Sequence, residues 1–121
     1  MKKKNVEDLI PDAIDVIEEE FKGKKIPKEF NGYISSFGAS IIQSGLKATV
    51  ANYENRNSNS NQDKSKLTKM ILKLLGGDGD LLLRYIINSD ENEIILKEKI
   101  KTSAVAIKLA IRTFEFEKKD K

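Results

Sequence analysis

The sequence predicts an all-α protein, a compact bundle of five to six helices formed by residues 1–121 as a single domain. Apolar residues recur every three to four positions in most segments, which is the spacing of one face of an α-helix. No segment sustains an alternation of apolar and polar residues, so a sheet is not expected. A chain of 121 residues can bury a sizeable core without a disulfide or a metal.

The first predicted helix starts near Asn5 or Asp8 and ends at Gly23. Pro11 fits this helix only in or near its first turn, because proline lacks the backbone donor that an interior position needs. Glycine suits the left-handed conformation that often follows a helix. The apolar face consists of Val6, Leu9, Ile10, Ala13, Ile14, Ile17 and Phe21.

A second helix is predicted to open at Pro27, since proline is favoured at the first helical position. Gly38 lies inside its pattern and can bend or break it, because glycine costs about 1 kcal/mol relative to alanine there. Gly45 reads as a C-cap or a turn, after which residues 46–53 form a short third helix. The apolar face of the second helix is Phe30, Tyr33, Ile34, Phe37, Ile41 and Ile42.

Residues 55–62, NRNSNSNQ, are polar and unpatterned, and they predict a mobile surface loop. Asp63 or Ser65 can cap the helix that follows. Gly76, Gly77 and Gly79 end that helix. Its core face is Leu67, Met70, Ile71, Leu74 and Leu75.

Two further helices complete the bundle. Asp80 is the predicted N-cap of a short apolar helix over residues 81–87. Asp90, with Glu93 three residues later, resembles a capping box. A long last helix then runs toward Phe116 with an apolar stripe that steps by three and four residues.

The composition argues against an enzyme. The chain has no cysteine and no histidine, so it lacks thiol catalysis, the usual general base near neutral pH and the commonest zinc ligand. No cofactor or metal is therefore expected. No apolar run is long enough to cross a bilayer and no secretion signal precedes the first helix, so no membrane association and a cytoplasmic location are expected.

Two acidic motifs are candidates for metal binding. Residues 76–80, GGDGD, could hold a metal as in a palm domain, but that site needs a hairpin in a sheet, and the flanks here are helical. A glycine turn is the simpler interpretation. Leu82 and Leu83 break the pattern of a calcium loop. Residues 18–20, three glutamates, could hold a cation, although a solvated acidic turn is the simpler explanation.

Binding of nucleic acid is better supported, because rows of lysine suit phosphate contacts without sequence preference. Each lysine could also serve only to solvate the surface. The candidate residues are Lys24, Lys25, Lys28, Lys47, Arg56, Lys64, Lys66, Lys69 and Lys73. Tyr33, Phe37 and Tyr53 could stack on bases, but their helical spacing is more typical of a core.

Charge is distributed unevenly along the chain, whose net charge is only +3. Residues 51–75 carry five basic and two acidic side chains, and residues 97–121 carry eight and four. Residues 76–96 between them carry one and five. This pattern suggests an anionic partner for the basic segments and self-complementary surfaces between copies of the chain, or simply a mixed solvated surface.

Residues 33–53, YISSFGASIIQSGLKATVANY, resemble the small subunit of the type III-B CRISPR effector complex, the fifth protein of the Cmr module. Gly38 stands where that family often has proline. The acidic first helix and the long last helix rich in alanine and lysine also fit the family layout. The matching positions are Ile41, Gln43, Ser44, Gly45, Leu46, Val50, Ala51 and Tyr53.

The resemblance implies a compact helical subunit that stacks in a few copies along the effector filament. Such subunits, with the large subunit, line the groove that holds the guide RNA paired with its target RNA, and they cut nothing themselves. The partners implied are therefore the other subunits, copies of the chain itself and the guide–target duplex. Three alternatives remain from the residues: the type III-A small subunit, a helix-turn-helix regulator and a helical adaptor with protein partners only.

Overall fold

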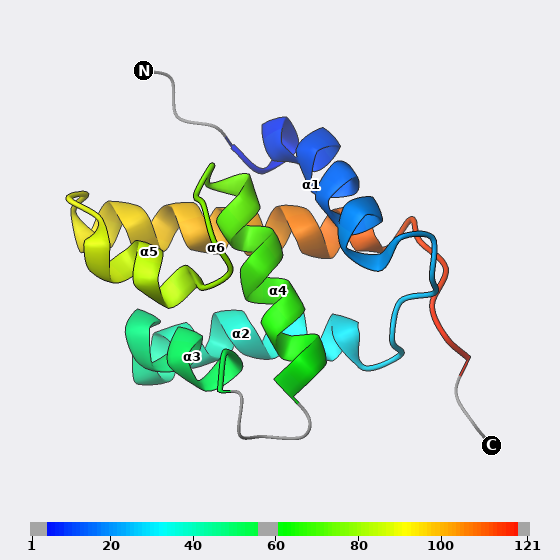
Figure 1. Ribbon diagram of the computed structural model, residues 1–121, viewed down its shortest axis with the longest axis horizontal. Coiled ribbons are helices and arrows are strands. Elements are labelled where there is room, and N and C mark those ends of the chain that lie inside the picture. Colours follow the sequence, from blue (N-terminus) through cyan, green and yellow to red (C-terminus); the bar gives the residue numbers. More distant parts are fainter. Residues whose placement is uncertain (1–4, 56–60, 119–121) are drawn as a thin grey trace.

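The computed structural model describes residues 5–55 and 61–118, and these residues form six helices and no strand (Figure 1). The all-α prediction is confirmed. None of the described helices is long and apolar enough to span a membrane. The helices are α1 (Val6–Phe21), α2 (Phe30–Ser44), α3 (Leu46–Tyr53), α4 (Asn61–Leu74), α5 (Leu82–Asn88) and α6 (Glu93–Ile111).

Helix α6 organises the core, because α1, α2 and α4 all pack against it. In Figure 1 it crosses the molecule behind α4, with α1 above and α2 below. Apolar spacing explains this arrangement, since the predicted stripes form most of the buried faces. Ile42 is the exception in α2: it is predicted on the apolar face but is 77% exposed, because it lies in the last turn of the helix away from the core. The largest fully buried side chains are Phe30, Phe37, Ile17, Ile26, Leu67, Met70, Ile71, Leu72, Leu82, Leu96, Ile100 and Ile107.

Helix α1 begins where its cap predicts. The Asn5 side chain accepts a hydrogen bond from the Asp8 amide at 2.9 Å, and the Asp8 carboxylate accepts one from the Asn5 amide at 3.2 Å. This reciprocal pair satisfies two of the free donors at the helix start. Pro11 lies inside the helix without ending it. At the other end, Lys22 and Gly23 adopt positive φ, 50° and 81°, and the chain turns away.

Helix α2 differs from its prediction at two points. It begins at Phe30 and not at Pro27, because the Phe30 amide donates to the Pro27 carbonyl in a preceding turn. Gly38 does not break the helix, which continues to Ser44. Gly45, at φ 96°, then separates α2 from α3, as the sequence predicts.

The caps of the later helices are also not the predicted ones. Helix α4 starts at Asn61, inside the predicted loop, so Asp63 lies in its first turn and Ser65 further along. The N-cap of α6 is Asn92, whose side chain accepts from the Ile94 amide at 2.8 Å, in place of Asp90. The starts of α4 and α6 therefore differ from their predictions by two or more residues.

Helix α5 is capped from a distance. Its N-cap residue is Leu81 and not Asp80, and Leu81 has no side-chain hydrogen bond to offer. Instead, the Leu82 and Leu83 amides donate to the two carboxylate oxygens of Glu54, at 2.8 and 3.1 Å. A carboxylate is well placed there, because helix N-termini carry free donors and partial positive charge. Glu54, just after α3, therefore fixes where α5 starts.

The segment after α6 returns to the connection between α1 and α2. The Ile26 amide donates to the Glu115 carbonyl at 2.9 Å, and the Glu117 amide donates to the Ile26 carbonyl at 2.8 Å. These bonds form an isolated parallel bridge between Ile26 and Phe116. Ile26 is fully buried, so the bridge holds the connection against the core.

Candidate nucleic-acid interface

The predicted basic residues fall into three groups on the fold. Lys24, Lys25 and Lys28 lie in the connection between α1 and α2 and are exposed. In this group, the Lys25 ammonium lies 3.8 Å from the Glu115 carboxylate, beside the parallel bridge. This group therefore occupies the end of the molecule where the described tail lies (Figure 1).

Lys47 forms the second group, in the first turn of α3. Its ammonium lies 3.4 Å from the Glu93 carboxylate at the start of α6. Both side chains are more than half exposed, so solvent screens this ion pair and its contribution to stability is small. Lys47 remains accessible to a partner.

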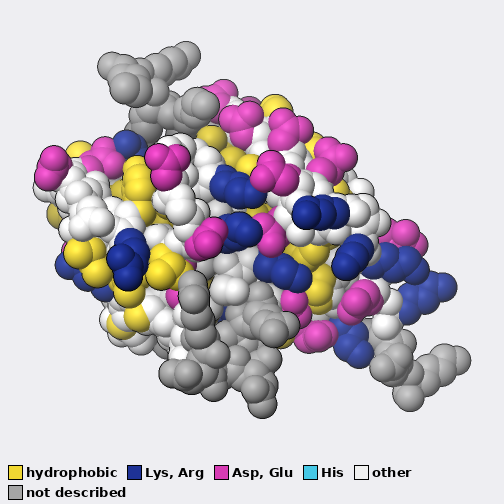
Figure 2. Space-filling view, in the orientation of Figure 1, with side chains coloured by type: hydrophobic (Ala, Val, Ile, Leu, Met, Phe, Trp, Pro, Cys, Tyr) yellow, Lys and Arg dark blue, Asp and Glu magenta, His cyan; other side chains and the backbone are white. Residues whose placement is uncertain are grey.

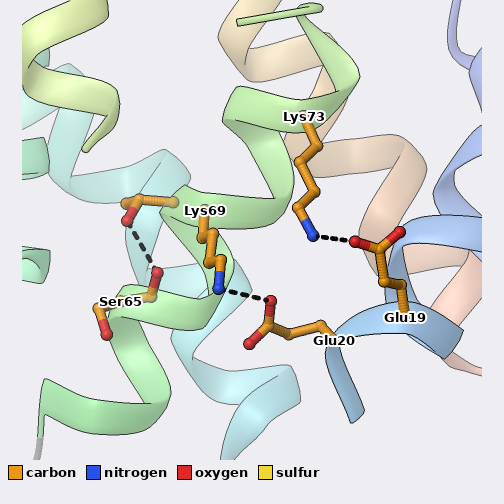
Figure 3. A network of polar contacts seen from close by, with 6 residues as sticks. Glu19, Glu20, Ser65, Lys69 and Lys73 are labelled. Atoms are coloured by element: carbon orange, nitrogen blue, oxygen red, sulfur yellow. Dashed lines mark hydrogen bonds and ion pairs between the residues drawn. The ribbon is translucent and has the colours of Figure 1, made fainter. Parts of the chain in front are cut away.

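Helix α4 carries the third group, which the sequence predicts as one lysine row. In the structure two of the four lysines pair with carboxylates of α1, and the other two lie over aromatic rings. Lys69 lies 3.7 Å from Glu20, and Lys73 lies 2.5 Å from Glu19, so both pair with the last turn of α1 (Figure 3). The three-glutamate segment is thus neither a cation site nor a purely solvated turn, because two of its members join α1 to α4.

The other two lysines of α4 lie over aromatic rings. The Lys64 ammonium is 5.7 Å from the ring centre of Tyr33 and 5.5 Å from that of Tyr53. Lys66 lies 5.3 Å from the ring of Phe21 and 3.4 Å from the Asp63 carboxylate. Ring faces attract cations, so these contacts hold the ammonium groups near the helix surface.

One predicted basic residue, Arg56, lies outside the described residues, as do positions 56–60 of the predicted mobile loop. Figure 2 shows one face of the molecule, on which basic and acidic side chains are intermixed. Four of the remaining candidates belong to α4, whereas Lys24, Lys25 and Lys28 lie at the α1–α2 connection. Nothing in the sequence pattern indicated that carboxylates would accompany the α4 row.

Electrostatics around Glu19 follow from this pairing. The hydrogen bond and charge of Lys73 hold the pKa of the Glu19 carboxyl below its ordinary value, with smaller contributions from Lys69 and Lys22. A carboxylate so stabilised stays ionised well into acid solution. The Glu19 carboxyl of this pair is therefore ionised at neutral pH.

The GGDGD segment is a turn between α4 and α5. Gly76 and Gly79 adopt positive φ, 77° and 89°, which glycine tolerates best. Gly77 has another role, because a Cβ there would lie 2.4 Å from Leu72 Cδ1 and 2.8 Å from Tyr85 Cδ2. Among the described residues, no three carboxylates gather in a way that could hold a metal.

Two of the three candidate stacking aromatics are core residues, and the third, Tyr33, is half-buried against the core. Phe37 and Tyr53 are buried, with ring centres 5.2 Å apart in an edge-to-face arrangement. The Tyr53 hydroxyl donates to the Tyr33 carbonyl at 2.7 Å. Burial raises the pKa of Tyr53 to about 12, with a smaller contribution from Tyr33. Neither buried ring can stack on a base.

Tyr53→Phe should alter the dependence of stability on alkaline pH. The pKa of Tyr53 is raised from 10.0, so the folded state favours the neutral hydroxyl. The stability that this hydroxyl contributes is complete below pH 10 and is lost as the pH rises through about 12. The variant should lose about 1 kcal/mol near neutral pH, from the missing hydrogen bond. Urea unfolding at pH 7 and pH 11 measures both effects. If the wild type loses no more stability than the variant between pH 7 and pH 11, the raised pKa of Tyr53 is contradicted.

Among the described residues several large apolar side chains remain exposed, and four of them belong to helix ends at the left of Figure 1. These four come from the end of α2, the end of α5 and the start of α6. A hollow beside them is lined mainly by apolar atoms from α3 and α5, including Ala51, Leu83 and Ile87. The four exposed side chains at these helix ends are Ile42, Ile87, Ile94 and Ile95, while Val105 and Leu109 are exposed further along α6. Such surface is typical of protein contacts.

The fold and this surface define a small all-α protein with a mixed-charge face and an apolar end. Residues 6–112 match the family model described as CRISPR-associated protein (Cas_Cmr5). The chain therefore belongs to the Cmr5 family, the small subunit of type III-B CRISPR complexes, as its resemblance predicts. No curated protein and no solved structure matches the chain.

Membership assigns the chain to a type III CRISPR effector complex, with the other subunits of that complex as its partners. The match favours this interpretation over the type III-A small subunit, the helix-turn-helix regulator and the adaptor.

Proposed function

We propose that the chain is a non-catalytic subunit that stacks in copies along the effector filament and supports the guide–target RNA duplex through sequence-independent backbone contacts. The α4 lysines carry this proposal. Lys66, Lys69 and Lys73 follow one another at intervals of three and four residues, so they share one side of the helix. At 1.5 Å per residue they extend over about 10 Å. A nucleic-acid strand presents several phosphates over that length, about one per 3.4 Å of duplex.

Lysine is suited to this role because its ammonium binds phosphate as a compact point charge and reads no base. The described aromatic rings near α4 are held in the core or covered by Lys64 and Lys66, so base stacking is not part of the proposal. One copy makes few phosphate contacts. Repetition along a filament raises the total affinity, because later contacts form within an assembled complex.

The exposed apolar end provides the second part of the proposal. Ile42, Ile87 and Ile94 are all more than half exposed, which is unfavourable for a surface that remains in water. We assign this end to a neighbouring subunit of the complex. Helix α4 crosses the middle of the molecule in Figure 1, whereas the helix ends that carry these isoleucines lie at its left, so RNA and protein contacts can form together.

Replacing Lys66, Lys69 and Lys73 by alanine should weaken target-RNA retention by the reconstituted complex, to a similar extent for unrelated target sequences. The slope of log affinity against log salt should fall by about 0.7 for each single-strand phosphate that the variant no longer neutralises. A matched variant replaces Lys97, Lys101 and Lys108 of α6, with the same change in net charge. Equal affinity and slope in wild type and α4 variant would refute the proposed phosphate binding. Equal weakening in both variants would show that only net charge matters.

A further inference from the structure

The last two lysines of α4, Lys69 and Lys73, already pair with carboxylates of the same chain. Glu19 and Glu20 approach the ammonium groups of Lys73 and Lys69 from the last turn of α1, as Figure 3 shows. Each carboxylate presents oxygen atoms to an ammonium much as a phosphate would. Any RNA strand that reaches these lysines therefore meets sites whose charge is partly neutralised.

The two carboxylates differ in how easily they can leave. The Glu19 side chain is 66% exposed, so it can turn into solvent and be hydrated there without disturbing the core. The Glu20 side chain is only 11% exposed and is held between helices. Displacing Glu20 would leave a poorly hydrated charge close to an incoming phosphate, which is unfavourable.

We infer that Glu19 and Glu20 are internal competitors for the RNA backbone, so that α1 restrains RNA binding at α4. This inference rests on the proposed function and adds a regulation of the same surface. Glu19 is the exchangeable competitor, which leaves Lys73 when a phosphate arrives. Glu20 stays with Lys69 and keeps a negative charge beside the strand. Weak binding by a single copy follows, and the repeated contacts of an assembled array would overcome it.

The test is target-RNA binding by the reconstituted complex at low and high salt, with Glu19→Gln/Glu20→Gln. Glutamine keeps the shape of glutamate and removes its charge. An exposed ion pair contributes a factor of up to about five to an equilibrium. The double variant should therefore bind RNA about two- to ten-fold more tightly at low salt, with a steeper salt dependence. Asp15→Asn/Glu18→Gln is the matched control, because it removes two exposed charges from the same helix and should have a much smaller effect.

A second comparison separates competition from general charge. In a Lys69→Ala/Lys73→Ala background, the gain from Glu19→Gln/Glu20→Gln should disappear, since no competed site remains. A gain that persists there, or an equal gain in the Asp15→Asn/Glu18→Gln control, would overturn the inference. Unchanged binding by Glu19→Gln/Glu20→Gln would also overturn it, while weaker binding by Lys69→Ala/Lys73→Ala alone would leave the proposed function standing.

Two further outcomes complete the test. If Lys69→Ala/Lys73→Ala binds RNA as the wild type does, the proposed phosphate binding fails and the inference fails with it. Should the double glutamine variant not fold, Glu19→Gln alone serves, because its exposed side chain lies outside the core. Tighter binding by that single variant supports the inference, and unchanged binding refutes it.

Discussion

Phe37→Ala should lower the free energy of unfolding by about 3–5 kcal/mol, the usual loss when a buried phenylalanine is truncated to alanine. Phe37 is fully buried in α2, and its ring packs edge-to-face on Tyr53 of α3. The substitution removes that contact and leaves a cavity between the two helices. A domain of this size has only about 5–15 kcal/mol of stability. We therefore expect the variant to unfold in much milder denaturant.

Urea unfolding followed by circular dichroism measures this change. Ile42→Ala is a matched control, because Ile42 lies on the same helix and is 77% exposed. Its free energy of unfolding should stay within about 0.5 kcal/mol of the wild type. Comparable destabilisation in both variants would mean that α2 does not bury the face that carries Phe37.

Glu54→Ala should destabilise the start of α5 by about 1–3 kcal/mol. The substitution removes the carboxylate that accepts from the Leu82 and Leu83 amides, and hydrogen bonds to charged groups are among the stronger ones. Helix α5 has only seven residues, so it cannot hold its first turn by its own hydrogen bonds. The helix start should therefore open locally before the whole domain unfolds.

Amide hydrogen exchange detects that local opening, since the Leu82 and Leu83 amides should exchange much faster in the variant. Glu54→Gln keeps one carbonyl oxygen, so exchange of these amides should be faster than in the wild type and slower than in the alanine variant. Asp80→Ala serves as a further control, because Asp80 is the cap that the sequence predicts and Leu81 takes its place. If Asp80→Ala accelerated exchange at Leu82 as much as Glu54→Ala does, the assignment of Glu54 as the cap of α5 would be wrong.

Much of the fold could be predicted because apolar spacing reports burial directly. The apolar faces of α1, α2 and α6 are correctly predicted at positions such as Ile17, Phe37 and Ile100. Helix starts are less predictable, since several residues nearby could serve as caps. Asn92 caps α6 in place of Asp90, and α5 takes its cap from Glu54, 28 residues before Leu82. A cap supplied through tertiary contact leaves no local signal.

In the candidate interface, too, the contacts made through tertiary packing could not be predicted from the sequence. The lysines of α4 are plain in the sequence, and their position on one helix could be predicted. Their partners depend on how α1 packs against α4, and sequence separations of 49 and 54 residues from Glu20 and Glu19 hide that pairing. Gly77 could be predicted only as a turn residue. Its close approach to Leu72 and Tyr85 depends on how the two flanking helices are placed.

The bridge between Ile26 and Phe116 has a consequence for how the chain acquires its structure. The first helix packs chiefly on the last, and the bridge joins segments 90 residues apart. Contacts of such long range slow folding, because a large loop must close before they form. During synthesis α1 cannot find its main partner until α6 has left the ribosome. The subunit therefore completes its core only after α6 has emerged, and only then offers its surfaces for assembly.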